Sequence, residues 1–169
     1  QKGLTIIELM IVLLVAAILL SLAAPSMDSL LKSSSIRAYQ TDLLNSVALA
    51  RGEAVSRNKR IAMCASDNGD SCGGGWSNGW LVFIDDGAGA NAGNGALDAG
   101  EEILRAVEYD GRNSISFFNT SSVAVTSLSW NFRGFTRHTT VDNPSPEEAA
   151  TVAILCGPKG DAMSARAVL

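Results

Sequence analysis

The chain has 169 residues, of which 47% are hydrophobic and 18% are charged, and its formal net charge is −4. This length allows one domain of ordinary size plus an additional segment, and the negative charge argues against a general nucleic-acid-binding protein. The charges are unevenly distributed, because residues 26–60 carry six Lys/Arg and three acids whereas residues 61–118 carry nine acids and two Arg. We expect the acidic middle of the chain to be well solvated and to repel polyanions.

The first predicted element is an apolar helix over residues 4–24, in which the only charged residue is Glu8. Such a helix would span about 31 Å at ~1.5 Å per residue, close to the thickness of a bilayer's hydrocarbon core. A carboxylate inside it costs about 2.5–3.5 kcal/mol on insertion scales, which makes Glu8 a functional candidate. Residues 4–25 are therefore predicted to span a membrane, with Lys2 on the cytoplasmic side.

Two simpler interpretations explain this segment less well. Residues 21–23 loosely fit a signal-peptidase site, but the apolar run is nearly twice the usual length and contains a charge. An ordinary single-pass anchor accounts for the length and for Lys2 but leaves Glu8 without a role.

Residues 2–10, KGLTIIELM, resemble the processing motif of type IV pilins and pseudopilins. The resemblance implies that a prepilin peptidase cuts between Gly3 and Leu4, which makes residues 1–3 the end of a leader, and that Leu4 is then N-methylated. Most members begin with Phe, so Leu4 departs from the pattern. The resemblance also implies an assembly role for Glu8, which would pair with the new terminal amine of a neighbouring subunit in low dielectric.

The helical pattern continues over residues 26–60 as an amphipathic helix. Pro25 matches a proline of many pilins, where it kinks or locally opens the helix, and the alternative is a helix end at the membrane surface. Asn58 and the cations around it suit a helix C-terminus. The apolar stripe, at steps of three or four and widened by two further residues, comprises Tyr39, Leu43, Val47, Ala50 and Ala54, with Leu44 and Val55.

Beyond residue 60 the pattern changes to short β-like runs separated by turn residues. A Pro-containing loop is expected at about 138–150, and His138 beside it is expected at the solvated surface. The predicted fold class is α+β, with the long helix packed on an antiparallel β-domain over residues 61–169. The expected strands are 61–65, 80–84, 103–109, 114–118, 128–132, 151–156 and 166–169.

The three cysteines and the single histidine show no spacing that suits zinc. In a domain outside the cytoplasm we expect one disulfide and one remaining thiol. Cys64 and Cys72 close a short loop rich in Gly, Asp and Asn, and this pair is the first choice. A Cys64–Cys156 pair stays open as the alternative.

Three internal strings resemble the H-type pseudopilin and FimT-type minor pilin group: RGEAVSR at 51–57, GWLVFID at 79–85 and NGALDAGEEILR at 94–105. The resemblance implies the type IV pilin fold and a non-enzymatic subunit without a cofactor, held in the bacterial inner membrane with its β-domain in the periplasm. Implied partners are other pilins or pseudopilins, membrane lipid, a prepilin peptidase and assembly-platform proteins. Many relatives continue with a last strand that carries a Gly-Arg pair. This chain stops at Leu169, in the middle of an expected strand, and begins without Met, so the sequence is expected to be trimmed at both ends.

The loop over residues 85–102 invites a calcium interpretation. In the EF-hand template, however, the first and third ligand positions would be Ala90 and Ala92, which cannot coordinate. A hairpin loop with positive-φ glycines and solvated acids is favoured instead. The weak calcium candidates are Asp85, Asn94, Asp98 and Glu101.

The favoured function is a minor pilin or pseudopilin subunit that assembles through its N-terminal helix into a type II secretion pseudopilus or a type IV pilus. One alternative is DNA binding for natural transformation, as for some FimT-like pilins. Its weak candidates spread over 34 positions and are offset by equal numbers of acids: Arg133, Arg137, Lys159 and Arg166. The second alternative, a signal-anchored periplasmic enzyme or binding protein, lacks any catalytic motif in the sequence.

Overall fold

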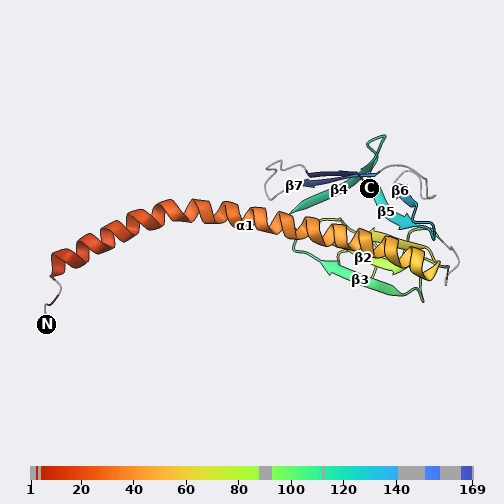
Figure 1. Cartoon of the computed structure of the whole chain (residues 1–169), viewed down its shortest axis with the longest axis horizontal. Helices are drawn as coiled ribbons and strands as arrows, with labels where there is room; N and C mark the ends of the chain where they lie inside the picture. The colour runs from red at the N-terminus through yellow and green to blue at the C-terminus, as the bar shows by residue number, and fades with distance from the viewer. Residues whose placement is uncertain are drawn as a thin grey trace.

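In the computed structural model, a single long helix leaves the N-terminus and packs against β-sheets along its C-terminal part (Figure 1). The structure describes residues 3, 5–87, 93–111, 113–140, 151–156 and 165–168, with the backbone alone described for 22–33, 151–156 and 165–168. All strand pairs in these ranges are antiparallel. The predicted α+β fold class is confirmed.

Helix α1 extends from Ile6 to Arg57, 52 residues that correspond to about 78 Å of helix. The backbone stays helical through Pro25, so no break occurs there, and Figure 1 shows a gradual curve. The helix ends where Asn58 adopts a left-handed conformation with φ 53°, and the Asn58 backbone N–H donates to the Ala54 carbonyl. Asparagine tolerates this conformation well, which explains why the helix stops at this residue.

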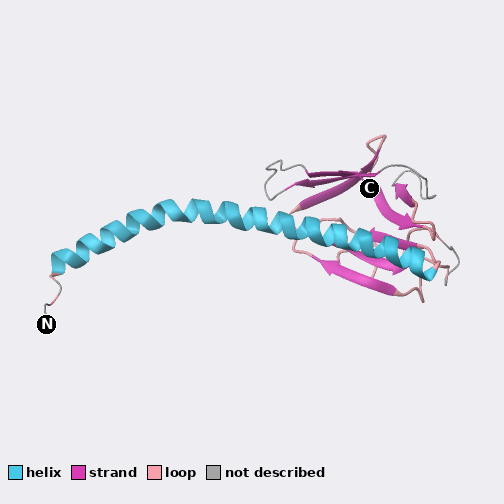
Figure 2. Cartoon of the chain, viewed as in Figure 1, coloured by secondary structure: helices cyan, strands magenta, loops and turns pink. Residues whose placement is uncertain are grey.

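The strands form two sheets, drawn in magenta in Figure 2. The larger sheet has the order β3-β2-β1-β5-β6 and the smaller one the order β4-β7-β8. Their bounds are β1 Ile61–Ala65, β2 Gly79–Ile84, β3 Ile103–Glu108, β4 Ser114–Asn119, β5 Val125–Trp130, β6 Thr136–Thr140, β7 Thr151–Cys156 and β8 Ala165–Val168.

Two sequence expectations about the strands were wrong. The strand expected at 128–132 is β5, Val125–Trp130, because Asn131 begins the turn into the next strand. Strand β6, Thr136–Thr140, was expected in part to be loop, since its polar sequence TRHTT lacks the alternation of a half-buried strand. His138 on the edge strand β6 is buried rather than solvated, at a position paired with Leu128 of β5.

The larger sheet is covered on both faces. Alternate residues of the central strands, such as Met63 and Val82, face the main core with α1. The opposite face carries a second cluster of Ala62, Cys64, Leu81 and Phe83, against which Cys72 and Leu97 pack from the two long loops. Strands β1 and β2 are therefore buried along their whole length, which explains their nearly continuous apolar sequences.

The buried stripe of α1 is narrower than the sequence suggested. Leu44 and Val55 are exposed, because the sheet contacts only one side of the helix. Ser46 occupies a fully buried position instead, and its hydroxyl accepts a hydrogen bond of 2.8 Å from the indole N–H of Trp80. A polar residue thus lies where an amphipathic pattern favours an apolar one.

Candidate functional site

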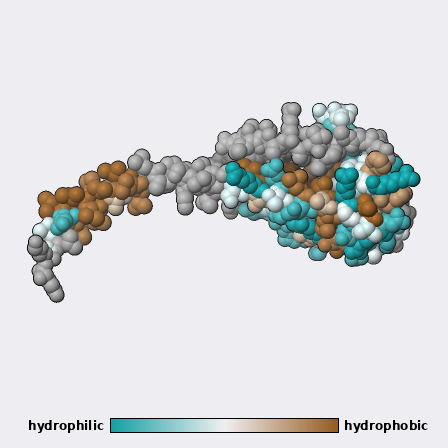
Figure 3. Space-filling view, in the orientation of Figure 1, coloured by the Kyte–Doolittle hydropathy of each residue, from teal (hydrophilic) through white to brown (hydrophobic). Residues whose placement is uncertain are grey.

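The N-terminal part of α1 is a bare apolar surface with one carboxylate. Its large hydrophobic side chains from Ile6 to Leu20 are between 48% and 82% exposed. The brown segment far from the domain in Figure 3 shows this surface. Exposed apolar area of this extent marks a membrane or protein contact rather than a solvated face.

Glu8 lies in the first turn of α1, close to the helix start. Thr5 is the N-cap, and its hydroxyl accepts a hydrogen bond of 3.4 Å from the Glu8 backbone N–H. A Thr followed three residues later by Glu is the pattern of a capping box. A negative charge in this first turn also interacts favourably with the helix dipole. The sequence already carried this signal in the spacing of Thr5 and Glu8, and the membrane interpretation of Glu8 overlooked it.

The remaining N-terminal candidates are described only in part. Gly3 precedes the helix with nothing within 4 Å of the position a Cβ would take. Leu4 lies outside the described residues, and Pro25 is described by its backbone alone. Among the residues that the structure describes with their side chains, no helix is both long enough and apolar enough to cross a membrane.

The C-terminal half of α1 is fixed to the domain by an aromatic and ionic cluster. The Tyr39 ring lies 3.8 Å from that of Tyr109 and 5.4 Å from that of Trp80, and its hydroxyl contacts the carbonyls of Trp76 and Ser77 at 2.9 and 2.7 Å. Burial raises the pKa of Tyr39 well above its ordinary value, with smaller contributions from Tyr109 and Asp110.

Asp42 extends this cluster on the polar side of the helix. Its carboxylate accepts a 2.5 Å hydrogen bond from the Tyr109 hydroxyl. It also forms an ion pair with Arg105 of β3, with 3.2 Å between the nitrogen and the oxygen. Burial, followed by the hydrogen bond to Asp42, raises the pKa of Tyr109. Because these contacts join α1 to an edge strand, they orient the helix on the sheet.

The calcium candidates lie in one loop, but several of their side-chain oxygens already accept hydrogen bonds from backbone N–H groups. Asp85 is buried and accepts hydrogen bonds from the backbone N–H groups of Gly93 and Gly95 at 2.8 and 3.0 Å. Burial raises the pKa of Asp85 despite these bonds, and burial likewise raises that of Glu101.

Asn94 and Glu101 also accept hydrogen bonds from backbone N–H groups of this loop. The Asn94 side chain accepts from the Ala96 N–H at 2.8 Å, and Glu101 accepts from the Asp98 N–H at the same distance. One carboxylate oxygen each of Asp98 and Glu101 is buried without a donor. Among the described side chains, no group of three or more His, Cys, Asp or Glu is arranged to hold a metal ion. The hairpin loop without calcium stays the favoured interpretation.

The structure describes the side chains of two of the four DNA candidates. Arg133 lies in the turn between β5 and β6, and Arg137 lies on β6 opposite Ser129. Arg166 belongs to β8 of the other sheet, described by its backbone alone, and Lys159 lies outside the described residues.

Cys64 and Cys72 form the expected disulfide, with their Cα atoms 5.6 Å apart. This bond excludes the Cys64–Cys156 alternative. The Cys72 sulfur also accepts a hydrogen bond of 3.3 Å from the Leu97 N–H, which links the two long loops over the sheet.

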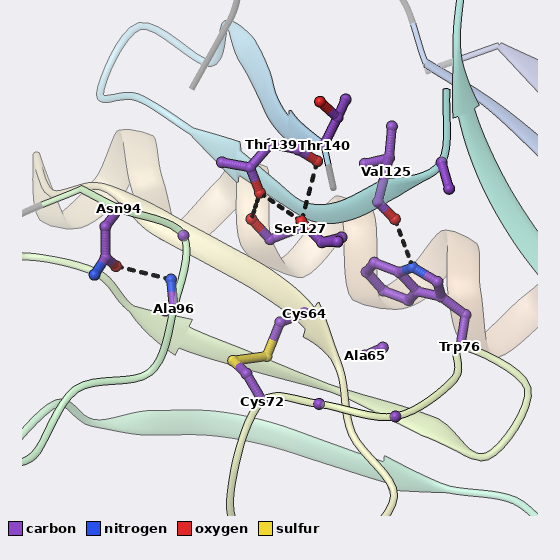
Figure 4. Close-up of a pocket in the computed structure, with 15 residues that line it drawn as sticks. Cys64, Ala65, Cys72, Trp76, Asn94, Ala96, Val125, Ser127, Thr139 and Thr140 are labelled. Carbon is purple, nitrogen blue, oxygen red and sulfur yellow. Dashed lines mark hydrogen bonds between the residues drawn. A yellow bond between two sulfur atoms is a disulfide. The ribbon is translucent and has the colours of Figure 1, made fainter. Parts of the chain in front are cut away.

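A pocket of about 570 Å³ opens beside this disulfide (Figure 4). Trp76 forms part of its wall, and the Trp76 indole N–H donates to the Val125 carbonyl at 2.9 Å. On another side, the Ser127 and Thr139 hydroxyls are hydrogen-bonded at 2.6 Å. The sequence did not predict this pocket, because its walls come from segments far apart in the chain.

Comparison with protein families gives two matches. Residues 40–168 match the family described as type II transport protein GspH, and residues 1–24 match the prokaryotic N-terminal methylation motif. The chain belongs to the GspH family. It is a minor pilin or pseudopilin subunit, as the N-terminal motif and the internal strings suggested, and its family is structural rather than enzymatic.

Solved structures similar to the chain include two crystal forms of the type IV minor pilin FimU from Pseudomonas aeruginosa. The P65 form is 20% identical, covers 71% of this chain and 73% of that chain, and has a TM-score of 0.42. The P21 form is 19% identical, covers 74% of each chain, and has a TM-score of 0.43. Comparison with curated proteins gives no match.

Family membership implies a membrane-anchored subunit that assembles with other pilins. The long helix then has two parts with different tasks. The exposed apolar part with Glu8 is available for lipid and for neighbouring helices, while the part from Ile36 onward carries the β-domain.

Proposed function

We propose that this GspH-family protein is a single-pass inner-membrane subunit whose domain faces the periplasm and which enters the filament of a type II transport system. The description of the matched family supports the secretion filament over a type IV pilus. In this proposal a prepilin peptidase cuts between Gly3 and Leu4, Leu4 is N-methylated, and assembly-platform proteins draw the subunit from the membrane. The match of residues 1–24 to the methylation motif carries the proposal.

Glu8 is proposed to recruit the subunit into the filament. Its carboxylate lies one turn from the helix start and is the only charge among the side chains described from Thr5 to Ser21. Cleavage before Leu4 would create a terminal amine at the same level of the helix. The amine of one subunit and Glu8 of another would neutralise each other, which relieves the cost of holding either charge in lipid.

The capping geometry provides a control that separates charge from helix stability. Glu8→Gln keeps a residue suited to the capping box but removes the charge, whereas Glu8→Val removes both. If charge pairing governs assembly, both variants insert in the membrane but enter filaments at least about tenfold less than wild type, as expected from losing ~1.4 kcal/mol or more. The measurement is the amount of each variant in sheared or cross-linked filaments relative to the membrane pool.

Normal incorporation of Glu8→Gln would contradict the recruitment role and leave only a capping role. Mass spectrometry of the mature N-terminus checks the processing step. A methylated N-terminal Leu4 is expected, and an intact leader or a chain beginning after Ala23 would overturn the proposal.

A further inference from the structure

Most of the large hydrophobic side chains exposed on the domain lie on one side of it. Among the side chains described beyond residue 33, Leu44 is 46% exposed, Val55 55%, Phe132 51% and Phe135 59%. One more, Ile103 on β3, is 38% exposed. Single exposed apolar residues are normal, but a group of them on one side of a domain marks a contact surface.

The exposed side of α1 carries a stripe of residues that follow one another at alternate steps of four and three. This is the heptad spacing by which two helices pack along each other. All members of the stripe are exposed, although its middle is apolar where a solvated helix face normally carries charges. We call it the outer stripe: Arg37, Thr41, Leu44, Ala48, Arg51 and Val55.

The turn between β5 and β6 extends this surface beyond the helix. A Cβ on Gly134 would lie 3.1 Å from the Arg51 side chain, so the turn lies against the outer stripe. Asn131 holds the turn closed, because its side-chain oxygen accepts from the N–H groups of Arg133 and Phe135 at 2.9 and 3.1 Å. Both exposed phenylalanines belong to this turn, residues 131–135, which we call the aromatic turn. Figure 1 shows the end of α1 on the same side of the domain as β5 and β6, away from the N-terminus.

Three cations surround the apolar residues of this surface. Arg37 and Arg51 belong to the outer stripe, and the Arg133 guanidinium lies 5.5 Å from the centre of the Phe132 ring. Among the described residues, none of these three arginines forms an ion pair with a carboxylate. The surface is therefore apolar and positively charged at once.

The acids of the same part of α1 lie on the opposite flank of the helix, toward β3. After residue 33 the helix carries two acids, Asp42 and Glu53. Asp42 pairs with Arg105 of β3, and Glu53 pairs with Arg57, which also contacts Glu102 directly before β3. Because β3 and β6 are opposite edges of the larger sheet, the neutralised charges and the unpaired cations lie on different sides of α1.

Gly52 is a residue of α1 that the packing of the domain does not explain. Glycine lowers helix stability relative to alanine, and nothing lies within 4 Å of the position that a Cβ of Gly52 would take. Gly52 follows Ala48 by one helical turn, beside the outer stripe. Residues this small let the backbone of a second helix approach closely.

We propose that the outer stripe and the aromatic turn dock an amphipathic helix of a different pilin-like subunit, one whose apolar stripe is flanked by acidic residues. The inference rests on the proposed function and specifies one of its contacts. The occupant is a helix because the outer stripe has heptad spacing, and it is acidic because the three arginines have no carboxylate partner among the described residues.

Two further observations fit this occupant. The outer stripe belongs to the same unbroken helix as the exposed apolar segment from Ile6 to Leu20, so a neighbouring helix that contacts this segment can continue along the stripe. A second copy of this chain fits less well, because two such surfaces would face each other with like charges.

Photocross-linking in the organism that encodes the chain identifies the partner. The full chain carries p-benzoylphenylalanine at position 44, and mass spectrometry identifies the cross-linked peptides. We expect adducts with a different protein that has the N-terminal methylation motif, in a helical segment that contains acidic residues. Adducts only with a second copy, only with proteins that lack this motif, or no adducts at all would overturn the proposal.

The same probe at position 103 is the matched control. Ile103 is also an exposed apolar residue, but it lies on β3, at the sheet edge opposite β6. It should give none of these adducts, and an equal yield from both positions would contradict the proposed surface.

Charge variants test the acidic nature of the partner with the probe kept at position 44. Ala48→Glu places an acid in the outer stripe and should lower the adduct yield about tenfold, the size expected for a hot spot. Ala38→Glu is its control, because Ala38 is exposed but lies one turn before Asp42, on the β3 flank. Arg51→Glu should lower the yield severalfold and Arg51→Lys should keep most of it. Equal losses with Ala38→Glu, or full yield with Arg51→Glu, would count against the contact.

Gly52→Leu separates docking from stability. Leucine forms helices better and has open space here, so the domain should melt no lower than wild type, whereas the added side chain should lower the adduct yield about tenfold. Tryptophan fluorescence follows melting, since all three tryptophans are in the domain and are at most 7% exposed. An unchanged yield would contradict a close helix approach at Gly52.

The two proposals fail in different ways. Filament entry that depends on Glu8, without pilin adducts from position 44, would refute the docked helix and leave the proposed function standing. Pilin adducts from a chain that is never processed at Gly3 would do the opposite.

Discussion

Single buried polar groups determine much of how α1 is attached to its domain. The Ser46 hydroxyl is fully buried and receives the Trp80 indole N–H, so neither group contacts water. An unpaired buried donor costs about 1–3 kcal/mol, more than the bond contributes when formed. This serine therefore fixes the rotation of the helix against β2 as well as stabilising it.

Ser46→Ala is predicted to lower the free energy of unfolding by about 1–3 kcal/mol, because Trp80 keeps its N–H without an acceptor. Denaturant unfolding followed by tryptophan emission measures the change. Ser56→Ala is the matched control: Ser56 is an exposed serine of the same helix, and its loss should change stability by less than about 0.5 kcal/mol. Equal effects of the two variants would contradict the role given to the Trp80 bond.

Tyr39 is predicted to make stability fall at alkaline pH. Its pKa in the folded chain is raised above the ordinary value of about 10, so the folded state keeps its proton where the unfolded state loses it. The stabilisation is complete below pH ~10 and is lost as pH rises beyond that value, at up to ~1.4 kcal/mol per pH unit for one group.

Unfolding measured at several alkaline pH values tests this behaviour. Tyr39→Phe should lower the slope of stability against pH above 10, because it removes one of the two tyrosines with raised pKa. Phenolate absorbance provides a second readout, since it should appear together with unfolding. Reversible ionisation of both tyrosines near pH 10 in a folded chain would show the prediction to be wrong.

At the scale of elements, the loop between β1 and β2 depends on its disulfide. Chain-entropy estimates give about 2–3 kcal/mol for closing a loop of this length. The double variant Cys64→Ser, Cys72→Ser is predicted to lower the free energy of unfolding by about 2–3 kcal/mol. It should also loosen the pocket wall that contains Trp76. Thermal melting with and without reductant checks it: reductant should destabilise the wild type and leave the variant unchanged.

Packing between α1 and the sheet depends on small residues. Ala50 and Ala54 are fully buried, which lets the helix approach β1 closely. Ala50→Leu is predicted to cost about 1–3 kcal/mol through overpacking. Ala48→Leu, on the exposed side of the same helix, should be close to neutral, and an equal loss there would point to helix propensity instead.

The sequence correctly predicted the elements that depend on the spacing and type of residues close together in the chain. The apolar run, the stripe through Tyr39 and Ala54, and Asn58 as a helix end are all readable from spacing and residue type. Strand β6 was not, because its burial arises from pairing with β5 rather than from apolar residues. The disulfide pocket and the Ser46–Trp80 bond join residues more than 30 positions apart, and no periodicity in one sequence reports such contacts.

At the scale of the whole molecule, the two parts of α1 are predicted to act independently in stability. Glu8 and Ser46 are 38 positions apart, about 57 Å along a helix, with no shared contact among the described residues. Changes so distant add without coupling. Glu8→Val should therefore leave the domain's unfolding midpoint unchanged while it lowers filament entry, whereas Ser46→Ala should lower the midpoint. The double variant should show the sum of both stability effects within about 0.5 kcal/mol, and a larger deviation would mean that the helix transmits strain from its membrane part to the domain.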